Sequence, residues 1–246
     1  MQFDQTIREH LNGRAFSSGL LVPIAEREVA IPVRCELIQS WTRQSRVVHV
    51  GFCDHLPLID RKIRDRTWLH ALLLQTSARC LGIDVNQEAV SYCRAQYGIS
   101  DVRCADLLSD DIPELAEDSW DYMVLGEILE HVDDPVAFLR KIRERFGRNI
   151  AKMVISVPNG FRWANFDLAR RHQEYINSDH RYWFTPYTLA KVVHQAGLAC
   201  ESFEFCEMDS FRLPRLYGLR PRTFRGIIRL RKYPALRSTL VMVASF

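Results

Sequence analysis

The clearest fold signal in the sequence is the stretch 120–135, WDYMVLGEILEHVDDP. Its residues 121–125 are apolar enough for a buried strand, and Pro135 stands where a following helix would begin. A glycine and several acidic residues lie between the two. Because open parallel sheets bind ligands at the carboxyl ends of their strands, this stretch predicts both a fold class and the place of a site.

On either side of this stretch, short apolar runs alternate with helical patterns. We expect strands over 46–51, 80–85, 101–105, 121–125, 150–157, 198–205 and 239–244, and helices over 68–77, 87–97, 135–147 and 186–196. Strands and helices that alternate in this way predict an α/β protein, with a mostly parallel sheet covered by helices on both faces.

Composition narrows the class of protein. The 246 residues are 47% hydrophobic and 26% charged, which excludes a disordered or low-complexity chain. No apolar run approaches the roughly 18 residues that cross a bilayer, and the N-terminus has no hydrophobic signal segment. The 7 cysteines include no C-x-x-C pair, so we expect reduced thiols rather than disulfides or a structural zinc site. These features predict a cytoplasmic protein.

Charge and pattern also divide the chain. We expect an N-terminal helical cap or lid over 1–45 and one domain over 46–246, with a basic insertion at about 210–237 before the last strand. Residues 210–246 hold nine Lys or Arg and no acid, which leaves 24 cations against 30 acids before them. Such cations can meet phosphates on a nucleotide-linked or lipid-linked substrate, an anionic surface or nucleic acid. Alternatively they pair with the acidic body, within one chain or across a homodimer.

Acidic residues follow three of the predicted strands: Asp84, Asp106 and Glu127. An ionised carboxylate at Asp84 can accept hydrogen bonds from two neighbouring ribose hydroxyls. Asp106 can accept from an adenine amine, while Leu107 offers a backbone amide to the ring. The alternative is that these acids cap the helices that follow them.

Several stretches together resemble the class I S-adenosylmethionine-dependent methyltransferases. The matching stretches are VVHVG (47–51), LGIDV (81–85), CADL (104–107), WDYMVLGEILEHVDDP (120–135), MVISVPN (153–159) and HRYWFTPYTL (180–189). The resemblance covers about residues 46–205, and the stretches 120–135 and 177–189 look like the small-molecule and glycan-modifying branch. It implies a Rossmann-like doubly wound sheet of about seven strands with the last strand antiparallel. It also implies S-adenosylmethionine as the cofactor, lying across the ends of the first, second and fourth strands.

Carried over residue by residue, the resemblance assigns the cofactor to one set of positions. These are Gly51, Phe52, Cys53, Asp84, Val85, Asp106, Leu107, Gly126 and Glu127. The loop HVGFCDH (49–55) departs from the family, because it keeps one glycine and has a histidine where the family has an acid. Bulkier residues narrow the approach of the backbone to a ligand. The cofactor therefore binds in a loop reshaped by Asp54 and His55, or its binding is weak or lost. Without G-x-G-x-x-G after the first strand, a dinucleotide is excluded.

Transfer to a hydroxyl needs a base, and histidine is the natural one near neutral pH. Three histidines lie near predicted strand ends: His55, His131 and His180. His131 follows Glu127 by four residues, so a helical turn would put both on one face. His180 lies among aromatic residues that suit the wall of a sugar pocket. The alternative is that these histidines are not bases and only pack against the fold or cap a helix. We expect no metal site, because the histidines lack ligand spacing.

The sequence therefore predicts a methyltransferase that acts on a small molecule, at an oxygen of a sugar or glycan precursor, in glycan or natural-product biosynthesis. Two other functions remain open. One is a non-catalytic methyltransferase-like binding or partner subunit. The other, less favoured, is a nucleic-acid methyltransferase.

Overall fold

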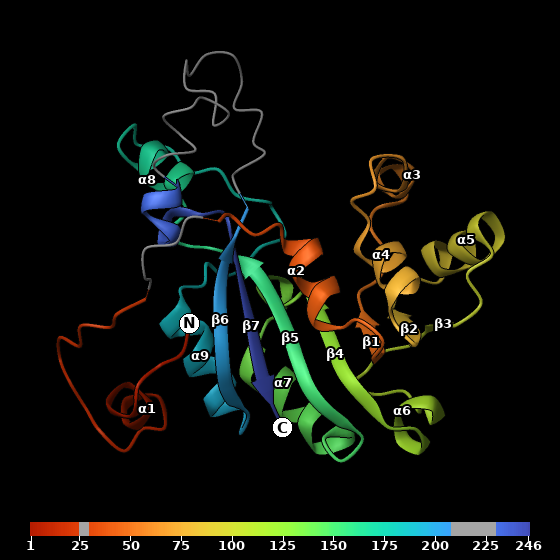
Figure 1. Cartoon of the computed structure of the whole chain (residues 1–246), viewed down its shortest axis with the longest axis horizontal. Coiled ribbons are helices and arrows are strands. Elements are labelled where there is room, and N and C mark those ends of the chain that lie inside the picture. The colour runs from red at the N-terminus through yellow and green to blue at the C-terminus, as the bar shows by residue number, and fades with distance from the viewer. Residues whose placement is uncertain (25–29, 208–229) are drawn as a thin grey trace.

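A computed structural model describes residues 1–24, 30–207 and 230–246, and it contains one seven-stranded sheet with helices on both faces (Figure 1). The strands are β1 (Arg46–Val50), β2 (Arg79–Asp84), β3 (Val102–Cys104), β4 (Trp120–Gly126), β5 (Ile150–Pro158), β6 (Ala199–Cys206) and β7 (Thr239–Ser245). Their order is β3-β2-β1-β4-β5-β7-β6, and β7 is antiparallel to both neighbours. The predicted strands and the antiparallel last strand are confirmed.

Three of the helices that follow strands begin at side-chain caps. The α-helices are α1 (Gln5–Leu11), α2 (Arg34–Trp41), α3 (Leu56–Arg64), α4 (Leu69–Thr76), α5 (Gln87–Tyr97), α6 (Pro113–Glu117), α7 (Pro135–Phe146), α8 (Trp163–Ala169) and α9 (Pro186–Gln195). Asn86 caps α5, Asp134 caps α7, and Thr185 forms a capping box with Thr188 on α9. The four predicted helices are present as α4, α5, α7 and α9. Helix α3 was not predicted, because four of residues 56–64 are charged and only Ile59 is buried.

Alternate residues of the central strands face opposite layers of helix. Val48, Met123 and Ile155 belong to a core that also contains buried residues of α1, α7 and α9. Their neighbours Val47 and Val124 belong to a second core with buried residues of α2 and α4. The sheet is thus covered on both faces, as the near-continuous apolar runs of its strands require.

The first 45 residues hold two helices on different faces of the sheet. Helix α1 packs against α9, whereas α2 packs against α4. Figure 1 shows the start of α2 close to the upper ends of β4 and β5. Arg34, the first residue of α2, hydrogen-bonds Ser156 in β5 at 3.2 Å. The N-terminal cap over 1–45 and the domain over 46–246 stay predictions. Arg34 does bring the N-terminal segment to the carboxyl end of β5, where a ligand is expected.

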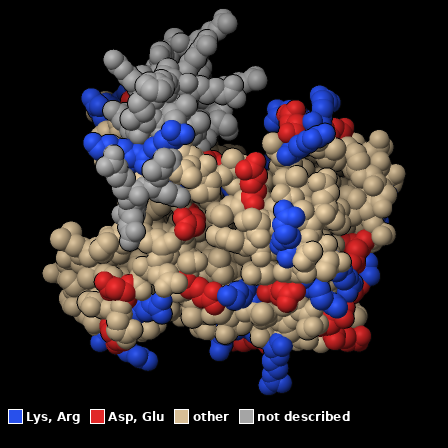
Figure 2. Space-filling model, in the orientation of Figure 1, with Lys and Arg blue, Asp and Glu red and all other residues tan. Residues whose placement is uncertain are grey.

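The structure does not describe residues 208–229, and most of the predicted basic insertion at about 210–237 therefore lies outside the described residues. Within the described part, Arg237 is buried and donates to the carbonyls of Phe205 at 2.9 Å and Ala30 at 2.6 Å. Arg237, which belongs to the predicted basic insertion, therefore stabilises the fold. On the face in Figure 2, Lys and Arg gather over α3, whose last turn carries Arg61, Lys62 and Arg64.

Across the described ranges, no helix is both long and apolar enough to cross a membrane. All seven cysteines are free, as predicted.

Candidate functional site

The carboxyl ends of four neighbouring parallel strands form one edge of the sheet. Strand β1 pairs with β2 and β4, and β4 with β5, with Val50 opposite both Ile83 and Leu125. This register brings Gly51, Asp84 and Gly126 to the same edge. The edge has two halves: the β1–β2 half, and the β4–β5 half with the loops that follow it.

In the β1–β2 half, the loop after β1 is bonded to the end of β2. The backbone N–H of Cys53 donates to Asp84 Oδ2 at 2.9 Å, and that of Asn86 donates to Oδ1 at 3.0 Å. Gly51 has a φ of +62°, and a Cβ there would lie 2.9 Å from Ile128 Cδ1. Glycine is therefore required at the position where the loop leaves β1.

Phe52 does not enter the edge. Its side chain is buried, and its ring lies 4.6 Å from the ring of His70. A Cβ on Gly82 in β2 would meet Phe52 Cδ1 at 2.8 Å, so the missing side chain of Gly82 makes room for the ring. The indole N–H of Trp68 then donates to the carbonyl of Phe52 at 2.9 Å. The departure from the family loop is thus accommodated inside the core.

The neighbouring thiol is not set up as a nucleophile. A hydrogen bond to Cys93, together with burial and the charge of Asp84, raises the pKa of the Cys53 thiol. A thiol that stays protonated is a poor nucleophile.

Asp106 does not cap the next helix, α6, whose N-cap is Ile112, and instead holds the turn that follows β3. Its carboxylate accepts from the backbone N–H of Leu108 at 2.8 Å and from the Ser109 hydroxyl at 3.1 Å. Leu107 is buried, with its carbonyl bonded to Arg145 at 2.8 Å, and Val85 is 72% exposed. The loop after β3 is therefore held by its own turn and by α7.

In the β4–β5 half, the backbone turns sharply after β4. Glu127 has a φ of +57°, and its N–H donates to the carbonyl of Ser156 in β5 at 2.9 Å. Its Oε1 lies 3.9 Å from Arg34 Nη1 and has no hydrogen-bond partner among the described residues. Burial raises the pKa of Glu127, and the charge of Arg34 opposes this. A left-handed conformation at a non-glycine residue points to strain at this edge.

The sequence grouped His131 with Glu127 on one helical face, and this grouping is wrong. Residues 129–131 form a short 3-10 turn, η1 (Leu129–His131), with Glu127 before it. The turn instead places Glu130 and His131 beside His180, and one ligand-type atom of each of the three lies within 4.8 Å of the others. Sequence reasoning missed Glu130, because its partner His180 comes from a loop far along the chain.

A second loop fixes His180 against this turn. The N–H of Arg181 donates to the carbonyl of Glu130 at 2.7 Å, and its guanidinium binds the Asp133 carboxylate at 2.5 Å. The hydroxyl of Tyr182 donates to the carbonyl of Asp133 at 2.6 Å. The position of His180 therefore follows from the backbone around it.

Burial dominates the electrostatics of this cluster. Glu130 is fully buried, and neither carboxylate oxygen has a hydrogen-bond partner among the described residues. Burial, reinforced by the charge of Glu127, raises the pKa of Glu130 to about 9. Burial also lowers the pKa of His180, with His131 and Arg162 adding to the effect.

His55, the third candidate base, lies apart from this cluster. It is exposed and precedes α3 as its N-terminal flanking residue. Asp54 accepts from the backbone N–H of His55 at 3.0 Å and pairs with Lys62. The structure does not bring His55 together with His131 and His180.

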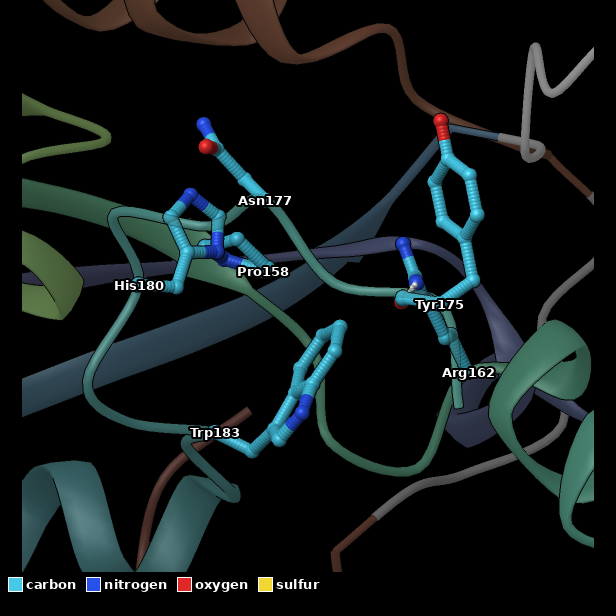
Figure 3. A pocket seen from close by; sticks show the side chains of 6 residues that line it. All are labelled: Pro158, Arg162, Tyr175, Asn177, His180 and Trp183. Atoms are coloured by element: carbon cyan, nitrogen blue, oxygen red, sulfur yellow. Dashed lines mark hydrogen bonds between the residues drawn. The ribbon is translucent and has the colours of Figure 1, made fainter. Parts of the chain in front are cut away.

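A pocket of about 180 Å³ opens beside His180 (Figure 3). It is lined by Pro158, Arg162, Tyr175, Asn177, His180 and Trp183. Figure 3 shows His180 and Asn177 on one side and Arg162 and Tyr175 on the other, with Trp183 between them below. The guanidinium of Arg162 lies 4.5 Å from the Trp183 ring and donates to the carbonyl of Tyr175 at 3.0 Å. The pocket thus combines an aromatic wall with fixed polar groups.

Comparison with known proteins supports the same fold. Residues 53–202 match the methyltransferase domain family, which is more than half of the chain. A small RNA methyltransferase, HEN1, aligns with a TM-score of 0.55 at 16% identity, over 92% of this chain and 27% of that chain. A SAM-dependent methyltransferase from Archaeoglobus fulgidus aligns with a TM-score of 0.50 at 14% identity, over 86% and 94%.

A third likeness is to a chain of the complex between the Haloferax volcanii Trm112 methyltransferase activator and a methyltransferase. Its TM-score is 0.50 at 20% identity, over 97% of this chain and 88% of that one. No curated protein matches by sequence. At these identities the solved structures establish the fold, whereas the family match establishes the domain. The chain therefore belongs to the class I methyltransferases, whose cofactor is S-adenosylmethionine.

Proposed function

We propose that this methyltransferase methylates a hydroxyl oxygen of a small polar acceptor, of the sugar or glycan-precursor class, held in the pocket beside His180. The pocket is the observation that carries the proposal. An aromatic ring at Trp183 offers a stacking face, and Asn177 and Arg162 offer polar groups. Enclosed sites with an aromatic wall and a few fixed polar groups suit a small polar ring.

We propose the β1–β2 half for the adenosyl end of the cofactor. Each Asp84 oxygen accepts one backbone amide, and a carboxylate has about four acceptor sites. Acceptor capacity is thus left for two ribose hydroxyls, so the residues fit the group. Asp106 and Leu107 would flank the adenine, with Val85 and Cys53 beside them. Gly51, Gly126 and Glu127 would line the methionine end, which supplies the electrophilic methyl group.

The acceptor hydroxyl must lose its proton as the new bond forms. We place this step at His131 and His180, because His180 lines the pocket and His131 is its neighbour at 4.6 Å between ring centroids. His55 is the less favoured candidate, since it lies outside this cluster. A hydroxyl acceptor therefore fits the pocket better than an amine, which needs no base when it is already neutral.

Calorimetric titration with S-adenosylmethionine tests the proposal. We expect micromolar binding that is at least about 100-fold weaker in Asp84→Ala, because two charge-assisted hydrogen bonds are lost. Asp111→Ala, an exposed acid, is the matched control. No heat at millimolar cofactor would instead support the non-catalytic partner subunit.

Acceptor identity needs a separate assay. Transfer of a labelled methyl group to sugars and glycan precursors should depend on the pocket, so Asn177→Ala and Trp183→Ala should raise KM. HEN1 acts on small RNA, and the basic segment of this chain keeps a nucleic-acid acceptor as the alternative. Methylation of RNA with binding that weakens steeply as salt rises would favour that alternative.

A further inference from the structure

We propose that Glu130, His131 and His180 bind one divalent transition-metal cation at the wall of the acceptor pocket. The inference deepens the proposed function and rests on it for the role of the cation. It also revises the sequence-based expectation of no metal site. That expectation considered linear spacing alone, whereas the fold supplies the third donor from the loop after β5.

The donor geometry is the first argument. One atom from each of the three side chains lies within 4.8 Å of the other two, and Glu130 Oε1 is 3.9 Å from His180 Nε2. Donors about 2.1 Å from one tetrahedral ion are about 3.4 Å apart. The donor atoms must therefore come closer to one another by about 1.4 Å or less, and rotation of the two half-buried imidazoles can supply this movement.

Unsatisfied polar atoms are the second argument. Both carboxylate oxygens of the fully buried Glu130 and the buried Nδ1 of His180 lack a hydrogen-bond partner among the described residues. Buried polar groups without partners are costly, and buried charges are normally paired or coordinate a metal. A cation between these side chains would remove this cost for the carboxylate.

Support for the donors is the third argument. The backbone on both sides of the cluster is fixed, because the carbonyl of Glu130 accepts from Arg181 N–H and that of Asp133 from the Tyr182 hydroxyl. Rigid placement of the ligands is what a metal site requires.

The donor set indicates the class of metal. Two imidazoles and one carboxylate suit Zn²⁺, Co²⁺ or Mn²⁺ better than Ca²⁺ or Mg²⁺, which prefer oxygen. Three protein donors leave coordination positions open toward the pocket that His180 lines. Neighbouring hydroxyls of a sugar can fill such positions.

The cation would polarise the acceptor hydroxyl and take over the role of a histidine base. The O–H bond of the acceptor breaks and its proton passes to water. The new O–CH₃ bond forms as the S–CH₃ bond of the sulfonium breaks, and the neutral thioether leaves. No oxidant or reductant is needed.

Titration of the whole protein with Co²⁺, followed by visible absorption, tests the inference without any acceptor. We expect one tight equivalent that Zn²⁺ displaces. Affinity should fall by more than about 100-fold in Glu130→Gln, His131→Asn and His180→Asn, exceeding the 10–100-fold effect of an outer-shell partner. His172→Asn, an exposed histidine, is the matched control and should bind Co²⁺ as the wild type does.

Absence of a tight equivalent in the wild type overturns the inference, as does unchanged affinity in the three variants. If Glu130→Gln fails to fold, the two histidine variants decide the result, since both side chains are partly exposed. Binding of S-adenosylmethionine is measured on the same samples. A protein that binds the cofactor and no cation refutes only the metal site, whereas one that binds a cation and no cofactor refutes only the proposed function.

Discussion

The two halves of the ligand edge are built in different ways. In the β1–β2 half, Asp84 accepts a hydrogen bond from the loop after β1, and the bulky Phe52 packs against Gly82. The neighbouring Asp106 accepts one within its own turn. In the β4–β5 half, Glu127 and Glu130 have buried carboxylate oxygens with no hydrogen-bond partner in the part of the chain that the structure describes, and the neighbouring His180 lines a pocket. The carboxylates of the first half are held by backbone N–H groups, whereas those of the second half keep oxygens that a ligand could bind.

This contrast shows how a loop with one glycine can coexist with the fold. Loss of the usual glycines is compensated by a glycine in the neighbouring strand. The other half instead holds a left-handed backbone at Glu127 and the fully buried Glu130, which the surrounding packing must maintain.

Among the substitutions, the largest effect on stability is expected for Phe52→Ala. Removing a fully buried ring should lower the free energy of unfolding by about 3–5 kcal/mol, because a cavity remains over Gly82. Urea unfolding measures this. Phe16→Ala is the control, since that ring is 90% exposed and its loss should change stability by less than about 0.5 kcal/mol. Equal costs for the two variants would contradict the packing role of Phe52.

A smaller cost is expected for Gly82→Ala, about 1–3 kcal/mol, because the new methyl group would meet Phe52 Cδ1 at 2.8 Å. The same urea experiment in a Phe52→Ala background should show a smaller cost, which keeps only the contact of the methyl group with His70 Cε1 at 2.9 Å. Additive costs in this double-mutant cycle would mean that the two residues do not share the space.

Acid should weaken the β1–β2 half through two buried histidines. Burial lowers the pKa of His70 to about 3 and that of His49 well below its usual value, and their Nδ1 atoms are 3.3 Å apart. Below pH 6.5 the unfolded chain binds protons that the folded chain does not. Stability is therefore lost as pH falls from 6.5 toward 3, by about 1.4 kcal/mol per pH unit for each histidine.

Unfolding in urea at several pH values checks this slope. Other groups titrate in the same range, so the relevant quantity is the difference between the wild type and His70→Gln. We expect a shallower slope in the variant. A slope identical to that of the wild type would show that His70 titrates normally.

The smallest effect is expected for Asn86→Ala. Loss of the cap, whose side chain accepts from Ala89 N–H at 3.0 Å, should cost about 1 kcal/mol. Cofactor affinity should stay unchanged, because the bond from Asn86 to Asp84 uses the backbone N–H. A loss of affinity in the calorimeter would show that the β1–β2 half is less rigid than its hydrogen bonds imply.

Much of the fold was predictable from local patterns. The strands containing Val48, Ile83 and Val124 are apolar runs, and the helices that follow them begin at polar caps or prolines. Helices α3 and α8 were not predicted, because both are short and bury few residues: Ile59 in α3, and Ala164 and Leu168 in α8.

The candidate site was predictable only in part. Asp84 and Asp106 are found at strand ends as expected, since parallel strands end at one edge. The cluster of Glu130 with His131 and His180 was not predicted. Sequence periodicity assumed an α-helical turn after β4, whereas the chain forms a 3-10 turn. The partner His180 lies nearly fifty residues further along the chain than His131.

The fit of the Phe52 ring over Gly82 constrains how this enzyme can be re-engineered. Grafting a glycine-rich loop from another methyltransferase would leave a hole above β2, and adding a side chain at Gly82 alone would force the ring outward. A transplant that succeeds must therefore exchange the loop and the strand residue together.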